Sequence, residues 1–135
     1  MRSLIADDES TSLKKMELIM KSYGPCDLVG DGQAAVDAFV QAWADWSPFD
    51  LILIDQIMPN LNGDAAVLKI RELEKAKNVP EDKKVKVVIV TGNSDKDTVV
   101  TCIQAGCNGF MVKPFDRQMV ESKLLKFFPL LAENK

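Results

Sequence analysis

The sequence predicts an α/β fold in which five strand–helix units build a parallel sheet with helices on both faces. Short apolar runs alternate five times with segments of helical periodicity. One run, at residues 51–54, is apolar at every position, which suits a central parallel strand covered on both faces. With 135 residues, 47% of them hydrophobic and 27% charged, the chain has the size and composition of one globular domain, so we assign residues 1–135 to a single domain.

The strands are expected where the apolar runs are short and are followed by polar or turn-forming residues. In chain order they fall at residues 4–6, 26–29, 51–54, 85–90 and 109–112. The connections back to the sheet are expected to be right-handed crossovers, each containing one helix.

Helical spacing of apolar residues follows every strand. In order, the five sets are Leu13, Met16, Ile19, Met20 and Tyr23; Ala35, Ala38, Phe39, Ala42, Trp43 and Trp46; Ala66, Val67, Ile70 and Leu73; Val99, Val100 and Ile103; and Met119, Val120, Leu124, Phe127 and Phe128. The expected capping residues are Ser10 or Thr11 for the first helix and Asp64, Asp97 and Asp116 for the last three. The expected helix ends are Gly24-Pro25, Ser47-Pro48 and Gly106.

Residues able to bind or react gather directly after the strands. The first strand leads to Asp7 and Asp8, the third to Asp55, the fourth to Thr91 and the fifth to Lys113. Ligands of an open parallel sheet bind beyond the carboxyl ends of its strands. With the strand order 2-1-3-4-5, the first and third strands are neighbours, and the three carboxylates converge on one small space.

Three clustered carboxylates repel one another unless a cation neutralises them. A hard divalent cation, Mg²⁺ or Mn²⁺, accepts oxygen ligands and suits such a cluster. We expect Asp8 and Asp55 to bind it directly and Asp7 to act through a water molecule. The backbone carbonyl of Ile57 is expected to complete the protein ligands.

The same cluster suits phosphoryl transfer, with Asp55 as the nucleophile. The transferring group carries negative charge on its oxygens, so its acceptor site must supply positive charge and hydrogen-bond donors. The cation and the Lys113 ammonium supply the charge, and the Thr91 hydroxyl donates to a further oxygen. Asp50 flanks the same strand at its opposite end, about 16 Å from Asp55 at about 3.3 Å per residue, and has no expected role.

Each of these residues also has a structural explanation when it is taken alone. Asp7 and Asp8 precede a helix, where acidic residues are common as caps. A threonine at a strand end is ordinarily a turn residue, and a lone lysine is ordinarily a solvated surface charge. The Trp43 and Trp46 pair is interpreted as packing. The chemical interpretation therefore depends on the four strand ends together.

Four segments occur in a recognisable order: Asp7-Asp8-Glu9; residues 50–59 with Gly63; residues 88–92; and Lys113-Pro114-Phe115. Together they resemble the CheY-like response-regulator receiver domain of two-component signal transduction, over almost the whole chain. The resemblance implies a flavodoxin-like three-layer fold and phosphorylation of Asp55. It also implies metal binding at Asp7 and Asp8, contacts of Thr91 and Lys113 with the phosphoryl oxygens, and a cis Lys113-Pro114 bond.

The resemblance further implies a partner histidine kinase or histidine phosphotransfer protein, and a downstream protein target. The family's switch aromatic falls on Phe110, in place of the commoner tyrosine, and Ile57 stands where many members are polar. We expect phosphorylation to draw Thr91 toward Asp55 and to turn Phe110 inward. The surface of the fourth helix, fifth strand and fifth helix would then change for partner binding or a phosphorylation-dependent homodimer. No enzymatic turnover is expected beyond self-phosphorylation and self-dephosphorylation.

Composition narrows the remaining possibilities. The net charge of −3 and the lack of a basic stripe argue against direct nucleic-acid contact. No apolar run or leader suggests a membrane or secretion, and three cysteines without CxxC spacing indicate a cytoplasmic protein. Histidine is absent, which excludes histidine nucleophiles and histidine-ligated metals. The chain ends soon after the fifth helix, which leaves open a stand-alone receiver or a piece of a longer regulator such as a hybrid kinase.

Three other functions fit the sequence less well. A phosphatase or mutase of the haloacid-dehalogenase type requires Asp-x-Asp after the first strand, whereas this chain has adjacent Asp7 and Asp8. A flavodoxin requires a phosphate-cradling loop rich in Ser, Thr and Gly at that position, and here the loop is acidic. A degenerate receiver that only docks partners would not need the complete acidic pocket.

Overall fold

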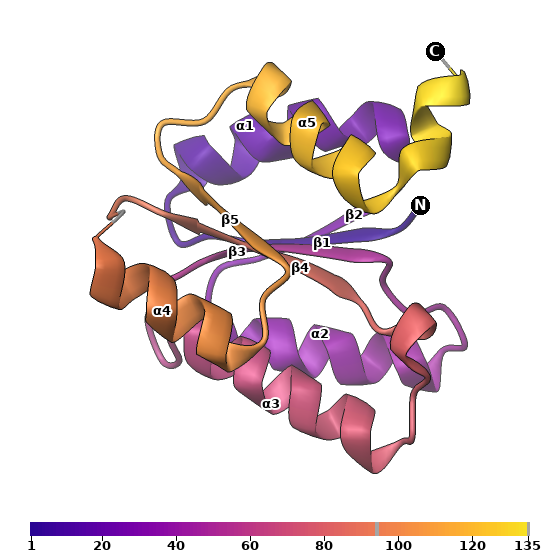
Figure 1. The fold of residues 1–135 in the computed structure, drawn as a ribbon. Helices are drawn as coiled ribbons and strands as arrows, with labels where there is room; N and C mark the ends of the chain where they lie inside the picture. Colours follow the sequence, from indigo (N-terminus) through magenta and orange to yellow (C-terminus); the bar gives the residue numbers. More distant parts are fainter. Residues whose placement is uncertain (94, 135) are drawn as a thin grey trace.

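A computed structural model describes residues 1–93 and 95–134 and has three layers (Figure 1). A parallel five-stranded sheet in the order β2-β1-β3-β4-β5 forms the middle layer, which confirms the predicted order. Its strands are β1 (Ser3–Ala6), β2 (Cys26–Val29), β3 (Leu51–Asp55), β4 (Lys86–Thr91) and β5 (Gly109–Val112).

Helices cover both faces of the sheet (Figure 1). On the first face lie α1 (Ser10–Met20) and α5 (Arg117–Phe127), and on the second lie α2 (Gly32–Ala44), α3 (Gly63–Ala76) and α4 (Lys96–Ala105). Short 3₁₀ turns occupy Lys21–Tyr23, Glu81–Lys83 and Pro129–Asn134. In the described residues, none of the helices combines the length and the apolar character that crossing a bilayer requires.

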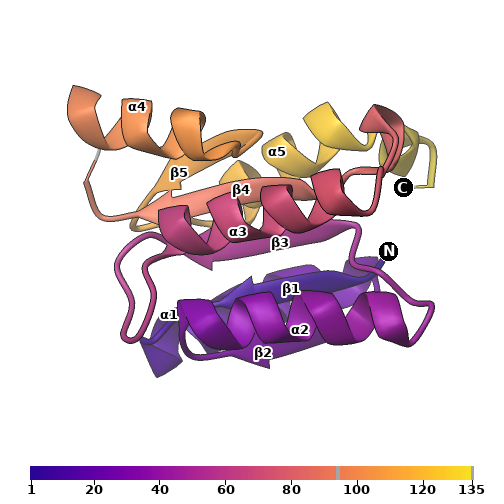
Figure 2. The same cartoon turned by 90° about the horizontal axis from the view of Figure 1, so that it is seen from below.

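The core consists of two apolar clusters separated by the sheet, and β3 is buried at all of its positions. Figure 2 shows α2 and α3 lying across the sheet on the side of the larger cluster. Phe39, Ile70 and Ile89 belong to this cluster, whereas Met20 and Leu124 belong to the other. Burial on both faces explains why residues 51–54 are apolar at every position.

The helix ends confirm one predicted acidic cap and contradict two. Asp116 caps α5 by accepting a hydrogen bond from the Met119 N–H at 2.9 Å. Asp97 was wrongly predicted, because Asp95 precedes α4 and accepts from the Thr98 N–H at 2.8 Å. An N-cap residue needs extended backbone, and Asp97 already lies inside the first turn.

The other wrong predictions concern α1 and α3, which begin without a side-chain cap. Glu9 precedes α1, so Ser10 and Thr11 are helical residues rather than caps. Asn62 precedes α3, and Asp64 lies in its first turn. There, the carboxylate of Asp64 still interacts favourably with the positive end of the helix dipole.

The end of α2 also differs from the prediction. The helix ends at Ala44, and Trp46 follows in a left-handed conformation with φ of 59°. Its side chain is 94% exposed, so the predicted packing role is wrong for Trp46. Trp43 is partly buried against the core, with the Lys77 ammonium 5.7 Å from its ring centre. Gly106, by contrast, ends α4 in the left-handed region as predicted.

A buried ion pair joins α3 to neighbouring segments. Glu74 is 1% exposed; one of its oxygens lies 2.7 Å from the guanidinium of Arg71, and the other accepts from the Val85 N–H at 2.8 Å. Arg71 also donates to the carbonyl of Gly106 at 2.9 Å. The pair therefore ties α3 to the start of β4 and the end of α4.

Candidate functional site

Three aspartates meet at the carboxyl edge of the sheet. Asp7 and Asp8 follow β1, and Asp55 is the last residue of β3. The parallel register pairs Ala6 with Ile54, so the residues that follow these two also lie side by side. One oxygen from each carboxylate lies within 4.8 Å of the others. This donor set suits a hard divalent cation, as the sequence predicts.

Burial makes this cluster sensitive to charge. Asp7 and Asp55 are buried, whereas Asp8 is exposed. Burial raises the pKa of Asp55, and the charges of Asp7 and Asp8 add to the rise, whereas a hydrogen bond from Lys113 opposes it. A bound cation would favour the ionised carboxylates in the same way as the lysine.

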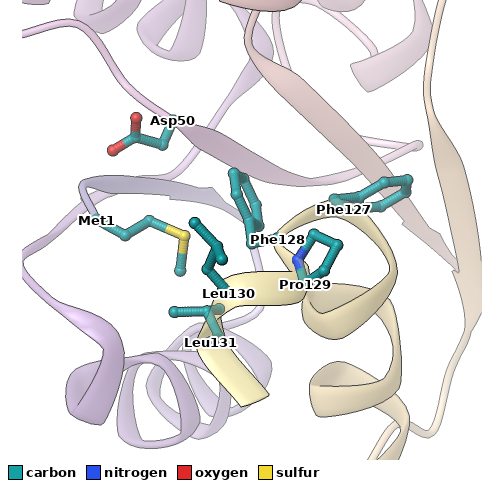
Figure 3. Close-up of a pocket in the computed structure, with 7 residues that line it drawn as sticks. All are labelled: Met1, Asp50, Phe127, Phe128, Pro129, Leu130 and Leu131. Carbon is teal, nitrogen blue, oxygen red and sulfur yellow. The ribbon is translucent and has the colours of Figure 1, made fainter. Parts of the chain in front are cut away.

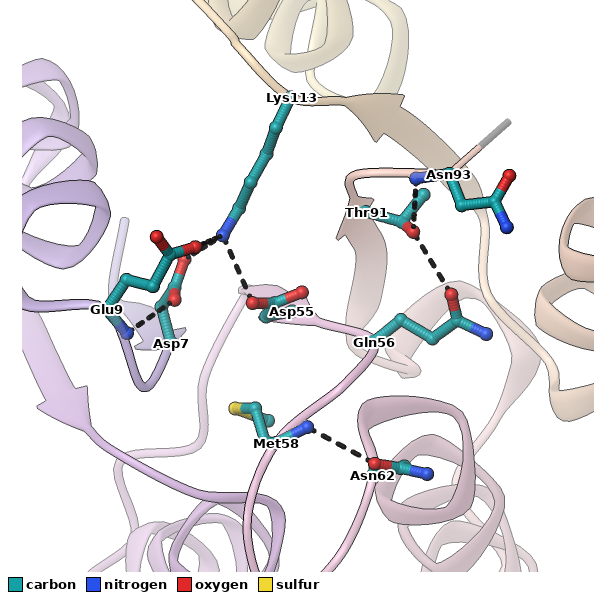
Figure 4. Close-up of polar contacts among 9 residues, drawn as sticks. All are labelled: Asp7, Glu9, Asp55, Gln56, Met58, Asn62, Thr91, Asn93 and Lys113. Atoms are coloured by element: carbon teal, nitrogen blue, oxygen red, sulfur yellow. Dashed lines mark hydrogen bonds and ion pairs between the residues drawn. The ribbon is translucent and has the colours of Figure 1, made fainter. Parts of the chain in front are cut away.

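Lys113 reaches the cluster from the end of β5 (Figure 4). Its ammonium lies 3.0 Å from Asp7, 2.8 Å from Glu9 and 3.1 Å from Asp55. Burial acts to lower the pKa of Lys113, but hydrogen bonds to the three carboxylates outweigh burial and raise it. The lysine is therefore a fixed positive charge beside Asp55.

Sequence reasoning assigned no role to Glu9, although the structure places it at the site. Its backbone N–H donates to Asp7 at 2.9 Å, which turns the chain so that its side chain faces Lys113. The contact with Lys113 lowers the pKa of Glu9. The only signal in the sequence was its position directly after Asp7 and Asp8.

Thr91 is buried at the end of β4, but its hydroxyl does not bond to Asp55. It donates to the side-chain oxygen of Gln56 at 3.0 Å and accepts from the Asn93 N–H at 3.1 Å (Figure 4). Gln56 is the second residue that sequence reasoning missed. Its position directly after Asp55 was the only indication in the sequence.

The loop after β3 is held in a fixed shape beside Asp55. The Met58 N–H donates to the Asn62 side chain at 3.2 Å, and the Gly63 N–H donates to the Gln56 carbonyl at 2.7 Å. A β-carbon at Gly63 would lie 2.0 Å from the carbonyl oxygen of Asp55, so only glycine fits there. Ile57 projects from this loop and is 71% exposed.

A cleft of about 320 Å³ contains these groups. Its lining includes Asp8, Asp55, Ile57, Thr91 and Lys113, so most of the predicted site residues border one space. The remaining two are Asp7, buried beside the cleft, and Phe110, half-buried against the cluster on the α2–α3–α4 side. The Lys113-Pro114 bond is cis, as expected.

A larger pocket of about 480 Å³ lies at the opposite edge of the sheet (Figure 3). Its lining is mainly apolar and consists of Met1, Asp50, Phe127, Phe128, Pro129, Leu130 and Leu131. Asp50 accepts a hydrogen bond from the Arg2 N–H at 2.8 Å, which gives this carboxylate a structural role. The acidic cluster and the lysine are at the other end of the molecule.

A family model for the response regulator receiver domain matches residues 3–125. The chain belongs to this family. It is 29% identical over 130 residues to the chemotaxis protein CheY of Pseudomonas aeruginosa. That match covers 95% of this chain and 96% of the relative. The chain is 27% identical over 125 residues to the transcription factor SKN7 of Saccharomyces cerevisiae; there the match covers 92% of this chain but only 18% of the relative.

Solved structures of receiver domains are similar to this chain over almost its whole length. One is the receiver domain of a sensor histidine kinase from Pseudomonas aeruginosa, with a magnesium ion coordinated in its active-site cleft. It is 28% identical, with a TM-score of 0.76, and the match covers 93% of this chain and 95% of that one. Another is CheY from Borrelia burgdorferi in a complex with CheX, BeF3 and magnesium. It is 25% identical with a TM-score of 0.80, over 94% and 88% of the two chains. The predicted flavodoxin-like receiver fold is confirmed.

Proposed function

We propose that this receiver domain accepts a phosphoryl group on Asp55 from the phosphohistidine of a partner kinase or phosphotransfer protein. One observation carries the proposal: the buried Asp55 carboxylate faces two further aspartates and an ammonium 3.1 Å away, at one edge of the sheet. This is the charge arrangement that an aspartyl phosphate requires.

In the proposed reaction, a carboxylate oxygen of Asp55 attacks the phosphorus atom. An O–P bond forms, the N–P bond of the phosphohistidine breaks, and its electron pair returns to the imidazole nitrogen. Because this chain contains no histidine, the donor must come from a partner or from a small phosphoryl donor. Hydrolysis of the aspartyl phosphate consumes a water molecule and returns the Asp55 carboxylate and inorganic phosphate, which makes the acceptor available again.

Mg²⁺, or Mn²⁺, is the proposed cofactor. Asp8 and Asp55 would hold it directly, Asp7 through a water molecule, and the carbonyl of Ile57 would complete the protein ligands. The magnesium in two similar receiver structures supports this assignment. When bound, the cation neutralises charge on the transferring phosphoryl group.

Lys113 and Thr91 are proposed to recognise the bound phosphoryl group. A phosphoryl group adds roughly −1.5 to −2 charges and three acceptor oxygens. Lys113 already lies beside the acceptor and can transfer its hydrogen bond from Asp55 to a phosphoryl oxygen. The Thr91 hydroxyl must first leave Gln56, and its movement makes space for Phe110 to turn inward.

The proposed output is a change in the surface formed by α4, β5 and α5. Val100 and Ile103 are exposed on α4, so this surface offers apolar contacts to a downstream protein or to a second copy of the chain. Phe110 belongs to β5 and packs against the same side of the core as Cys102 and Ala105 of α4, which links the switch to this helix.

The proposal is tested by labelling with acetyl phosphate and Mg²⁺, followed by separation of the phosphorylated form on a phosphate-affinity gel. Asp55→Asn is expected to abolish the label. Asp50→Asn is the matched control, because Asp50 precedes the same strand at its opposite end, and it is expected to label like the wild type. Full labelling of Asp55→Asn would reject the assignment.

A further inference from the structure

The hydrogen bond to Gln56 uses the only proton that the Thr91 hydroxyl can donate. The hydroxyl donates to Gln56 at 3.0 Å, and its oxygen accepts from the Asn93 N–H at 3.1 Å. A hydroxyl has one donor and two acceptor sites. Thr91 therefore cannot donate to a phosphoryl oxygen on Asp55 until its bond to Gln56 breaks, whereas the Asn93 bond can persist.

The backbone of Gln56 is fixed on both sides of the residue. Its N–H donates to the Val90 carbonyl at 3.2 Å, and its carbonyl accepts from the Gly63 N–H at 2.7 Å. The side chain consequently extends from a rigid point toward the end of β4, and Figure 4 shows its oxygen facing the Thr91 hydroxyl. The bond is a defined contact between the β3 and β4 ends rather than an interaction of a loose surface residue.

We propose that Gln56 is a positioning residue that restrains the switch: it holds Thr91 in the unphosphorylated conformation and thereby weakens binding of a phosphoryl group at Asp55. This inference rests on the function proposed above and identifies a residue that regulates it. The Gln56 side chain bonds to Thr91, so its proposed effect on Asp55 acts through Thr91.

The expected size of the effect follows from the strength of one hydrogen bond. A bond between neutral groups contributes about 0.5–1.5 kcal/mol, which corresponds to roughly 2- to 12-fold in an equilibrium constant. Removing the acceptor at position 56 should therefore increase the affinity for a phosphoryl mimic by roughly 2- to 12-fold. The gain requires the Thr91 hydroxyl, so it should vanish when that hydroxyl is absent.

The test is a titration of the full chain with beryllofluoride in the presence of Mg²⁺, followed by calorimetry. Gln56→Met removes the acceptor at nearly constant length, and Thr91→Val removes the hydroxyl at constant shape. We expect tighter binding for Gln56→Met in the wild-type background and no gain in the Thr91→Val background. Gln41→Met, on α2 at the opposite end of the molecule, is the control and should bind like the wild type.

Unchanged or weaker binding by Gln56→Met, or an equal gain without the Thr91 hydroxyl, would overturn the inference. A second measurement uses the unphosphorylated protein and does not depend on phosphorylation. In NMR spectra, Thr91→Val should shift the side-chain amide resonances of Gln56, whereas Thr101→Val should not. An unshifted Gln56 amide contradicts the restraint itself, whereas a wild type that fails to bind beryllofluoride contradicts the proposed acceptor site.

Discussion

Replacing Lys113 with methionine should destabilise the metal-free protein and strengthen its response to Mg²⁺. The ammonium lies within 3.1 Å of three carboxylates, two of which are buried. At 3 Å and an effective dielectric constant of 20, each contact with the two buried carboxylates, Asp7 and Asp55, corresponds to about 5.5 kcal/mol before desolvation is subtracted. Removing one partner from a buried ionic group costs about 3–5 kcal/mol. Because Glu9 is exposed, we expect the lower value, about 3 kcal/mol.

We expect Mg²⁺ to compete with Lys113 for the oxygens of Asp7 and Asp55, so the variant should bind the ion more tightly. Relief of about 1.4 kcal/mol of this competition corresponds to about tenfold in affinity. At a concentration 100 times the wild-type dissociation constant, a ligand that binds only the folded state adds about 2.7 kcal/mol to the wild type. The same concentration is about 1,000 times the dissociation constant of the variant and adds about 4.1 kcal/mol.

The assay is urea unfolding of both proteins in EDTA and at increasing Mg²⁺ concentrations. Lys84→Met is the control, since Lys84 makes a surface pair with Glu81 and the variant should unfold at nearly the same urea concentration as the wild type. Equal stability of Lys113→Met and wild type in EDTA would refute the electrostatic reasoning. Equal responses to Mg²⁺ would refute the competition for shared carboxylates.

Three further outcomes are expected. Asp55→Asn should increase the free energy of unfolding at pH 7, because burial raises the pKa of Asp55 and so disfavours its ionised form in the fold. In urea titrations, this gain in stability should shrink as the pH falls toward that pKa. Glu74→Ala should cost about 3 kcal/mol in the same assay, because Arg71 and the Val85 N–H lose a buried partner, but leave labelling by acetyl phosphate intact. Gly63→Ala should cost about 1–3 kcal/mol and slow labelling, since the new methyl group displaces the Asp55 backbone.

The fold was predictable from two features of the sequence: the helical spacing of apolar residues and the positions at which the short apolar runs end. The fully apolar run at residues 51–54 indicated a central strand, and β3 is indeed buried at every position. Helix ends were less predictable, because Asp95 and Asp97 are equally suitable by residue type, and only the backbone conformation decides which one caps α4. Trp46 fitted the helical spacing, but the helix ends two residues before it.

The charged members of the site were predictable because parallel strands bring their ends to one edge. Asp7, Asp8, Asp55 and Lys113 could be found by position alone. Glu9 and Gln56 could not be found in this way, because their roles depend on the direction of the side chain after the strand ends. Each also directly follows an aspartate that already had a predicted role. The direction of the Thr91 hydroxyl likewise required the structure.

The most direct test of the central claim is to locate the phosphoryl group chemically. Protein treated with acetyl phosphate and Mg²⁺ is reduced with borohydride, which converts an aspartyl phosphate to homoserine, and its peptides are sequenced by mass spectrometry. We predict homoserine at position 55 only, and none when Mg²⁺ is replaced by EDTA. Homoserine at Asp7 or Asp8, or a phosphoryl group on a serine or threonine with position 55 unmodified, would contradict the account.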